Sequence, residues 1–141
     1  MTNIQGSFPK TRLRRNRMKN FSRRLVAENN LSTNDLILPL FVCDGNNVED
    51  PIQSMPGVSR HSIDKLLHKV EEVVKLSIPA IAIFPQIEAS LKNNEGSLAF
   101  DENNLVCRSI KSIKKEFTDI GIICDVALDP FTDHGHDGLV I

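Results

Sequence analysis

The sequence predicts an α/β protein with a parallel sheet, because three short apolar runs alternate with two amphipathic segments. The apolar runs lie at residues 36–43, 80–84 and 120–128, and their length and β-branched side chains are typical of buried strands. Strands that alternate with helices and lack hairpin signals between them pair in parallel under a helical cover. Two architectures fit this order, an open doubly wound sheet and part of a (β/α)8 barrel.

The first predicted strand contains Pro39 and ends before Asp44 and Gly45. Because proline cannot donate a hydrogen bond to a sheet ladder, Pro39 indicates an edge or distorted position. We expect residues 51–57, which include two prolines and a glycine, to form a loop after this strand.

A first helix is predicted from Ser62, an N-cap residue followed by Asp64, to the stop at Pro79. Its apolar side chains recur at helical spacing and define one face: Ile63, Leu66, Leu67, Val70, Val73 and Val74. A second helix with the same kind of apolar face is predicted over residues 105–117. Each helix follows one predicted strand, as a parallel sheet requires.

The third predicted strand carries a carboxylate, Asp125, inside an otherwise apolar run. A carboxylate there has to be paired, hydrogen-bonded or close to a ligand, so it indicates either a structural ion pair or cap, or a site. A cluster within 13 residues favours a site at the carboxyl end of the strand: Asp125, Asp129, Asp133, His134, His136 and Asp137. Carboxylates and imidazoles suit Mg²⁺ or Mn²⁺ and, less well, Zn²⁺, although the same residue types also populate ordinary loops.

The charge is distributed unevenly. Residues 1–24 hold eight basic side chains and no acidic one, whereas the rest of the chain holds nine basic and all 18 acidic side chains. We therefore expect an N-terminal basic arm over residues 1–34 and a domain over residues 35–141. Such an arm can bind nucleic acid, an anionic membrane or the acidic body of a neighbouring subunit, or it can be a solvated tail.

Cysteine usage and hydropathy restrict the cellular context. The three cysteines are widely spaced, so we expect no disulfide framework and a cytoplasmic location. The longest apolar stretches fall far short of the roughly 20 residues that a membrane span needs. We therefore expect no membrane partner.

Four stretches agree in order with one enzyme family. The longest is DVALDPFTDHGHDG at residues 125–138, and the others lie at residues 23–41, 52–58 (IQSMPGV) and 92–99. Together they resemble the family of porphobilinogen synthase, also called 5-aminolaevulinate dehydratase. The match covers essentially all 141 residues.

The resemblance implies a (β/α)8 TIM barrel with an N-terminal arm, of which this chain supplies about the first three strands. It implies a hydro-lyase that condenses two 5-aminolaevulinate molecules to porphobilinogen, with loss of two waters, in tetrapyrrole and haem biosynthesis. The arm is expected to wrap a neighbouring subunit, usually in a homo-octamer, which leaves no role for nucleic acid. Asp125 is expected to support the substrate site by accepting a hydrogen bond from a substrate amine or by holding a proton-transfer water.

The sequence departs from the zinc-type members of the family. Those members carry cysteines at the positions of Ala127, Asp129 and Asp137. One methyl group and two carboxylates remove a soft thiolate site, so the resemblance implies a subclass that responds to magnesium, or to a monovalent cation. Asp129 and Asp137 are thus the candidate metal ligands, and we expect no zinc there.

The family's two Schiff-base lysines lie on later strands, beyond residue 141, and no lysine of this chain matches them. We expect the lysines present to be ordinary solvated amines: Lys92, Lys111, Lys114 and Lys115. By itself the 141-residue chain is therefore expected to be inactive, and either aggregated or partly unfolded. The alternative to an enzyme is a non-catalytic fragment or interaction module, and a more remote one is a basic-armed nucleic-acid binder.

Overall fold

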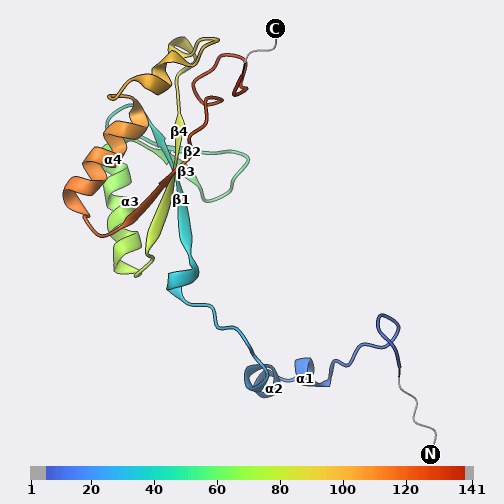
Figure 1. Ribbon diagram of the computed structural model, residues 1–141. Coiled ribbons are helices and arrows are strands. Elements are labelled where there is room, and N and C mark those ends of the chain that lie inside the picture. Colours follow the sequence, from blue (N-terminus) through green and yellow to red (C-terminus); the bar gives the residue numbers. More distant parts are fainter. Residues whose placement is uncertain (1–5, 139–141) are drawn as a thin grey trace, which may run out of the picture. The chain divides into compact units, whose positions relative to one another are not determined.

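The chain divides into two compact units, Met1–Ser32 and Thr33–Ile141, close to the predicted end of the basic arm. The structure is a computed structural model that describes residues 6–138 (Figure 1). Each unit is described by itself.

The first unit contains two short helices, α1 (Arg15–Met18) and α2 (Asn20–Leu25). None of its described residues is buried. Leu13 and Phe21 are both largely exposed, although both are apolar. The described part of the arm therefore has no hydrophobic core of its own.

The second unit is built on a mixed five-stranded sheet in the order β2-β3-β1-β4-β5. Parallel pairing joins β1 to β3, β1 to β4, and β4 to β5, whereas β2 and β3 pair antiparallel. The strands have the following bounds: β1 (Ile37–Cys43), β2 (Glu49–Pro51), β3 (Ser59–His61), β4 (Ala80–Gln86) and β5 (Gly121–Cys124).

The three predicted parallel strands are confirmed as β1, β4 and β5, but the expectation of a sheet without hairpins is wrong. The segment predicted as a loop begins in β2 and leads through a turn into β3. The third strand is also shorter than predicted, since it ends at Cys124 and leaves Asp125 just after it. The described residues form an open sheet, which is consistent with part of a barrel and is not a closed one.

Pro39 lies in β1, which has neighbours on both sides. On one side it stands opposite Ala82 of β4. On the other side β3 reaches only Phe41 and Val42. Pro39 therefore lies where β1 is locally an edge, and this explains how a proline is accommodated in a central strand.

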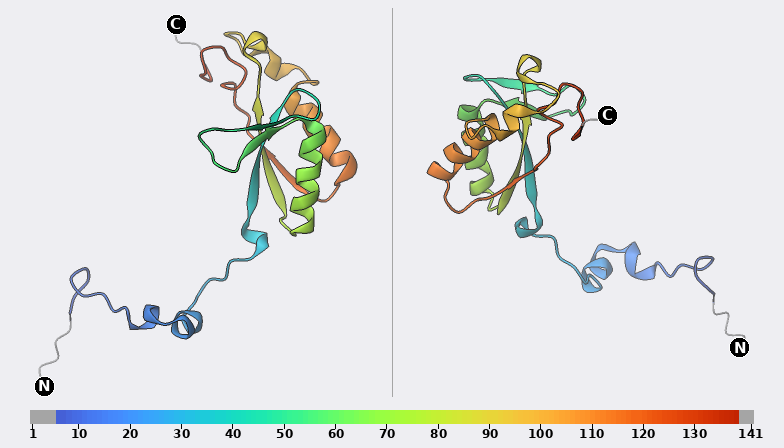
Figure 2. Two further views of the ribbon diagram at one scale, coloured as in Figure 1. Left: turned by 180° about the vertical axis from the view of Figure 1, so that it is seen from behind. Right: turned by 45° about the horizontal axis from the view of Figure 1, so that its top comes forward.

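Two helices, α3 (Ile63–Lys75) and α4 (Leu105–Glu116), cover one face of the sheet (Figures 1 and 2). Between helices and strands lies a single cluster of buried side chains: Leu40, Val42, Leu66, Val70, Val73, Ile81, Ile83, Ile87, Leu105, Ile113, Ile120 and Phe131. We call this side of the sheet the covered face. Among the described residues, no helix is both long and apolar enough to cross a membrane.

The helix starts differ in their capping. Ser62 occupies the predicted N-cap position of α3, but its side chain makes no capping bond. Instead Ser62 Oγ accepts a hydrogen bond from the main-chain N–H of Val48 at 2.8 Å, which fixes the segment before β2. In α4, Asn104 Oδ1 accepts from the main-chain N–H of Cys107 at 2.9 Å, as a capping residue does.

The opposite side, the open face, is also apolar but has no layer above it among the described residues. Because side chains alternate along a strand, residues between the buried ones point to this side. Ile37, Phe84 and Ile123 are 52%, 39% and 48% exposed. Phe41 and Phe84 stand opposite each other in register, with ring centroids 5.7 Å apart.

Candidate functional site

A cavity of about 480 Å³ lies where the parallel strands approach their carboxyl ends. Its lining comes from β1, the β2–β3 hairpin, β4 and the loops that follow β4 and β5: Phe41, Ile52, Met55, Arg60, Phe84, Pro85, Gln86, Lys92, Asp129 and Pro130. In open parallel sheets and in barrels, ligands bind at this end of the strands. This cavity is therefore the candidate active site.

The polar side chains of the cavity carry both signs of charge. Arg60 and Lys92 are cationic, Asp129 is anionic and Gln86 adds an amide. Arg60 Nη1 also contacts Asp50 Oδ2 at 2.9 Å, an ion pair that joins β3 to β2. The walls between these groups are largely apolar. Such a lining suits a small molecule that carries an ammonium group and a carboxylate on a short carbon chain.

Arg60 is placed at the cavity by the hairpin that the sequence did not predict. In β3 it stands opposite Phe41 of β1, so it lies on the open face while its neighbour His61 is buried on the other side. The ion pair with Asp50 restricts the guanidinium within this hairpin.

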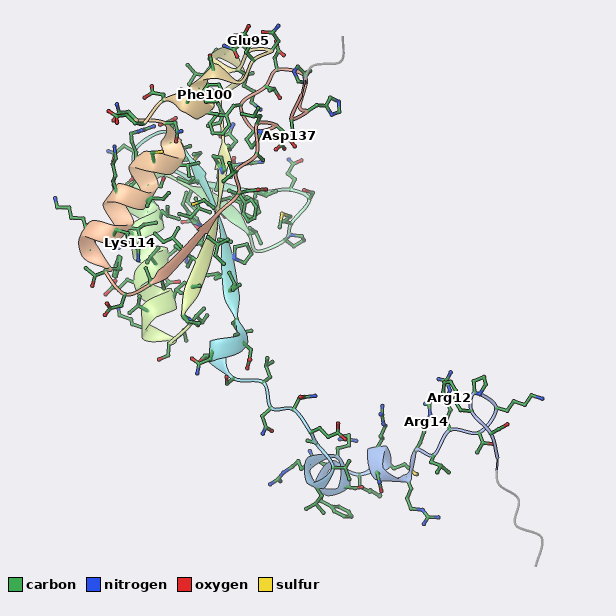
Figure 3. All side chains as sticks on the ribbon, viewed as in Figure 1. Arg12, Arg14, Glu95, Phe100, Lys114 and Asp137 are labelled. Atoms are coloured by element: carbon green, nitrogen blue, oxygen red, sulfur yellow. The ribbon has the colours of Figure 1, made fainter. Side chains whose placement is uncertain are left out.

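Asp129 reaches the cavity from the loop that follows β5. Asp137 lies later in the same loop (Figure 3). Asp137 Oδ1 accepts hydrogen bonds from the main-chain N–H of Leu128 at 2.7 Å and of Asp129 at 3.0 Å. These two bonds stabilise the ionised carboxylate and lower the pKa of Asp137.

The same loop packs on residues 93–97. The main-chain N–H of Asn93 donates to the carbonyl of Phe131 at 3.4 Å, and the N–H of Asp133 donates to the carbonyl of Asn93 at 3.1 Å. A smaller cavity of about 240 Å³ lies between the two segments, lined by Asn94, Glu95, Leu128, Thr132, Asp137 and Gly138. The loop thus separates two cavities, with Asp129 at one and Asp137 at the other.

The structure divides the predicted cluster rather than bringing it together. Asp125 lies just after β5, is exposed and does not line the 480 Å³ cavity, and its predicted role stays a prediction. His134 and His136 stack on each other with ring centroids 5.9 Å apart. His134 Nε2 also lies 3.1 Å from the carbonyl oxygen of Asn94, so this pair belongs to the contact with residues 93–97.

The predicted metal ligands Asp129 and Asp137 lie at opposite ends of the loop after β5. Residues 6–138 contain no group of three or more histidine, cysteine, aspartate or glutamate side chains that could hold a metal ion. Asp137 Oδ1 already accepts two main-chain hydrogen bonds, and Ala127 offers no donor. The role of Asp129 and Asp137 as magnesium ligands and the use of magnesium by the protein stay predictions.

Most of the residues that line the 480 Å³ cavity were not singled out by the sequence. Lys92, expected to be an ordinary solvated amine, is only partly exposed and lines the cavity. By contrast, Lys111 and Lys114 lie on the exposed side of α4 and donate to main-chain carbonyls. Lys92 belongs to one of the stretches that carry the family resemblance, and this was the one signal that could have singled it out.

Comparisons with known proteins agree with the resemblance. The family model described as delta-aminolevulinic acid dehydratase matches residues 10–141. Delta-aminolevulinic acid dehydratases from Bradyrhizobium diazoefficiens and Chlamydia pneumoniae are 57% and 45% identical to this chain, each over 92% of its length. The chain spans only 36% and 39% of these two relatives.

A solved structure gives the same result. The delta-aminolevulinic acid dehydratase of Toxoplasma gondii, in complex with the reaction product porphobilinogen, superimposes with a TM-score of 0.84 at 40% identity. The alignment covers 93% of this chain and 37% of the Toxoplasma chain. The likeness therefore extends to both sequence and fold over the part of the family that this chain spans.

Proposed function

Because the chain belongs to the delta-aminolevulinic acid dehydratase family, we propose that it supplies part of a porphobilinogen synthase. The reaction is the condensation of two 5-aminolaevulinate molecules to porphobilinogen with loss of two waters, a hydro-lyase step in haem biosynthesis. The Toxoplasma relative was solved with porphobilinogen bound, which supports this product for the whole protein.

The main support for the proposal is that the 480 Å³ cavity is lined by side chains of both charges. 5-Aminolaevulinate has an amine at one end, a carboxylate at the other and a ketone between them. Lys92 and Arg60 can each donate to a carboxylate, and Asp129 can accept from an ammonium group. Phe41 and Phe84 then cover the carbon chain and exclude water from that side.

The residues present bind and orient, and they do not supply the covalent step. The two Schiff-base lysines that the resemblance implies match no lysine among these 141 residues. Asp125, at the end of β5, is proposed to accept a hydrogen bond from a substrate amine or to hold a proton-transfer water. The activity is thus proposed for the whole protein that contains this chain.

A substitution at Lys92 tests the cavity assignment in the intact protein. In Lys92→Gln, we expect the KM for 5-aminolaevulinate to rise by roughly 10-fold or more, the factor that one lost charge-assisted hydrogen bond brings. The matched control is Lys111→Gln, because Lys111 is exposed and its Nζ donates to the main-chain carbonyl of Glu102. If both variants turn over 5-aminolaevulinate like the parent, the cavity is not the substrate site.

The second candidate is a non-catalytic fragment or interaction module. It is favoured by one observation, that no lysine among these 141 residues matches the family's two Schiff-base lysines. Porphobilinogen formation by the native protein purified from its source, together with the mass of that protein, separates the two. A native protein of about 15.8 kDa that forms no porphobilinogen would establish the module.

For the basic arm we propose contact with another subunit, in a homo-octamer located in the cytoplasm. Support comes from the side chains of the first unit, where exposed apolar residues such as Leu13 and Leu25 accompany the arginines. Exposed apolar groups of this kind are typical of interfaces. Deletion of residues 1–32 is expected to lower the oligomeric mass in light scattering, and an unchanged mass would contradict the proposal.

A further inference from the structure

One carboxylate closes the loop of residues 128–137. Asp137, at the end of the loop, accepts hydrogen bonds from the two main-chain N–H groups at its beginning, those of Leu128 and Asp129. Both bonds are short, at 2.7 and 3.0 Å, and both are of the charge-assisted kind. The closure is therefore made by the chain itself.

Thr132 fixes the same loop from inside. Its side chain is buried, and its Oγ1 lies 3.3 Å from the carbonyl oxygen of Asp129 and 3.0 Å from that of His136. The main-chain N–H of Asp129 is thus held by Asp137, while the single hydroxyl proton of Thr132 lies within reach of the carbonyls of Asp129 and His136, of which His136 is nearer. Asp129 itself lines the 480 Å³ cavity.

A metal ion would close the loop differently. It would need oxygen or nitrogen ligands from several side chains, and Mg²⁺ in particular demands near-octahedral coordination. The described residues provide no such group, and the Asp137 oxygen that faces the loop is already an acceptor for two amides. The hydrogen bonds to Asp137 therefore provide the closure that a metal ion would otherwise supply.

We propose that Asp137 is a positioning residue that closes the loop of residues 128–137 without a metal ion and so sets the place of Asp129 at the cavity. The closure stands on the hydrogen bonds alone, whereas its effect on turnover rests on the proposed function. Asp137 does not touch the substrate in this proposal. It acts through the main chain of Asp129.

Amide hydrogen exchange in the intact protein tests the closure. In Asp137→Ala, the amides of Leu128 and Asp129 should exchange roughly 10-fold or more faster, since each loses a charge-assisted acceptor. Asp137→Asn keeps an acceptor oxygen and should restore part of the protection. The matched control is Asp133→Ala, because Asp133 contacts residues 93–97 through its main-chain N–H, which the variant retains.

The metal alternative is tested in the same experiment by adding EDTA, and separately Mg²⁺, to the parent protein. We expect protection of Leu128 and Asp129 to be unchanged in both. The proposal is overturned if EDTA removes the protection, or if Asp137→Ala exchanges like the parent.

Turnover of 5-aminolaevulinate then tests the positioning role. We expect kcat to fall in Asp137→Ala and to recover in part in Asp137→Asn, while Asp119→Asn, at an exposed carboxylate before β5, keeps the parent value. If kcat is unchanged when protection is lost, the positioning role is wrong. If the parent makes no porphobilinogen but Asp137→Ala still loses protection, the proposed function fails and the closure stands.

Discussion

The two faces of the sheet have similar composition and different surroundings. On the covered face, Ile81 and Ile83 of β4 are buried against α3 and α4. On the open face, Phe84 of the same strand is 39% exposed and Ile123 of β5 is 48% exposed. Within residues 6–138, the same strands thus supply a buried core on one side and an apolar surface without a covering layer on the other.

Because of this difference, we expect the covered face to contribute to stability and the open face to contribute to binding at the cavity. The covered face holds the buried side chains, whose removal from water drives folding. The open face leads to the cavity, where Arg60, Lys92 and Asp129 gather at the carboxyl ends of the strands. Substitutions on the two sides should therefore affect different measurements.

The largest expected effect concerns the open face in the isolated 141-residue polypeptide. We expect it to form no porphobilinogen and to self-associate, because apolar side chains on an exposed sheet invite contact between chains. Ile123→Lys should lower the associated fraction in analytical ultracentrifugation. Val74→Lys is the matched control, because Val74 is 45% exposed on α3 and should leave association unchanged. A monomeric parent polypeptide would contradict the expected self-association through the open face.

At the carboxyl end of β5, Asp125→Asn in the intact protein should lower kcat by about 10²–10⁴-fold, the range for a lost proton-transfer group. Its stability should change little, since Asp125 is exposed. The control is Asp119→Asn, an exposed carboxylate before the amino end of the same strand. Steady-state kinetics and urea denaturation of both variants provide the test, and unchanged turnover in Asp125→Asn removes this residue from the site.

On the covered face, Leu66→Ala should lower the free energy of unfolding by about 2–5 kcal/mol, because it leaves a cavity in the core. The kcat of the folded protein should stay near the parent value. Val74→Ala on the same helix should change stability by less than about 0.5 kcal/mol, since Val74 is half exposed. Urea denaturation followed by circular dichroism gives both values, and a similar loss in the two variants would contradict the division between the faces.

A pH-dependent effect is expected from His61 on the covered face. Burial lowers the pKa of His61, and its Nδ1 has no hydrogen-bond partner among the described residues. The charged groups that act on it are of both signs: Glu49, Lys69, Glu72 and Lys65. Because the unfolded chain then binds the proton more readily, stability should fall as pH decreases from about 7 to 5.

His61→Gln should flatten this dependence, and His68→Gln, at an exposed position of α3, should leave it unchanged. Urea midpoints at several pH values measure the slope. An equal slope in the parent and in His61→Gln would show that other groups account for it.

The smallest effect is expected at the start of α4. Asn104→Ala removes the capping oxygen that accepts from Cys107 N–H and also the Nδ2 donor to the carbonyl of Ala99, and it should cost about 1 kcal/mol of stability. Asn103→Ala next to it is the control, since Asn103 is engaged through its main-chain N–H and carbonyl. Equal stability of the two variants would show that packing on the covered face, rather than the cap, fixes the beginning of α4.

The long strands and both main helices could be predicted because each carries a continuous or periodic apolar pattern. β2 and β3 could not, since Glu49–Pro51 and Ser59–His61 are polar and too short for any period. They are held by pairing with each other and with β1, and by the contact between Val48 and Ser62. Such strands depend on tertiary contacts that no local pattern encodes.

The candidate site could be predicted only in part, because local sequence patterns reveal one of its segments and tertiary contacts bring the others to it. Asp129 and Asp137 belong to one dense run of acidic and histidine residues, so their loop stood out. Arg60 and Lys92 come from separate elements and meet Asp129 only in the folded unit. The residue types of the loop also indicated a metal ion, because a sequence does not reveal that one of its carboxylates already accepts two amide hydrogens.

The strand order has a consequence for synthesis on the ribosome. Taken in the order in which they emerge, β3 joins one edge of β1, β4 joins the other edge, and β5 joins β4, while β2 pairs only with β3. None of the five described strands has to enter between two that are already paired. The nascent sheet can therefore widen strand by strand at the pace of translation, about 5–20 residues per second, with each helix docking before the next strand arrives.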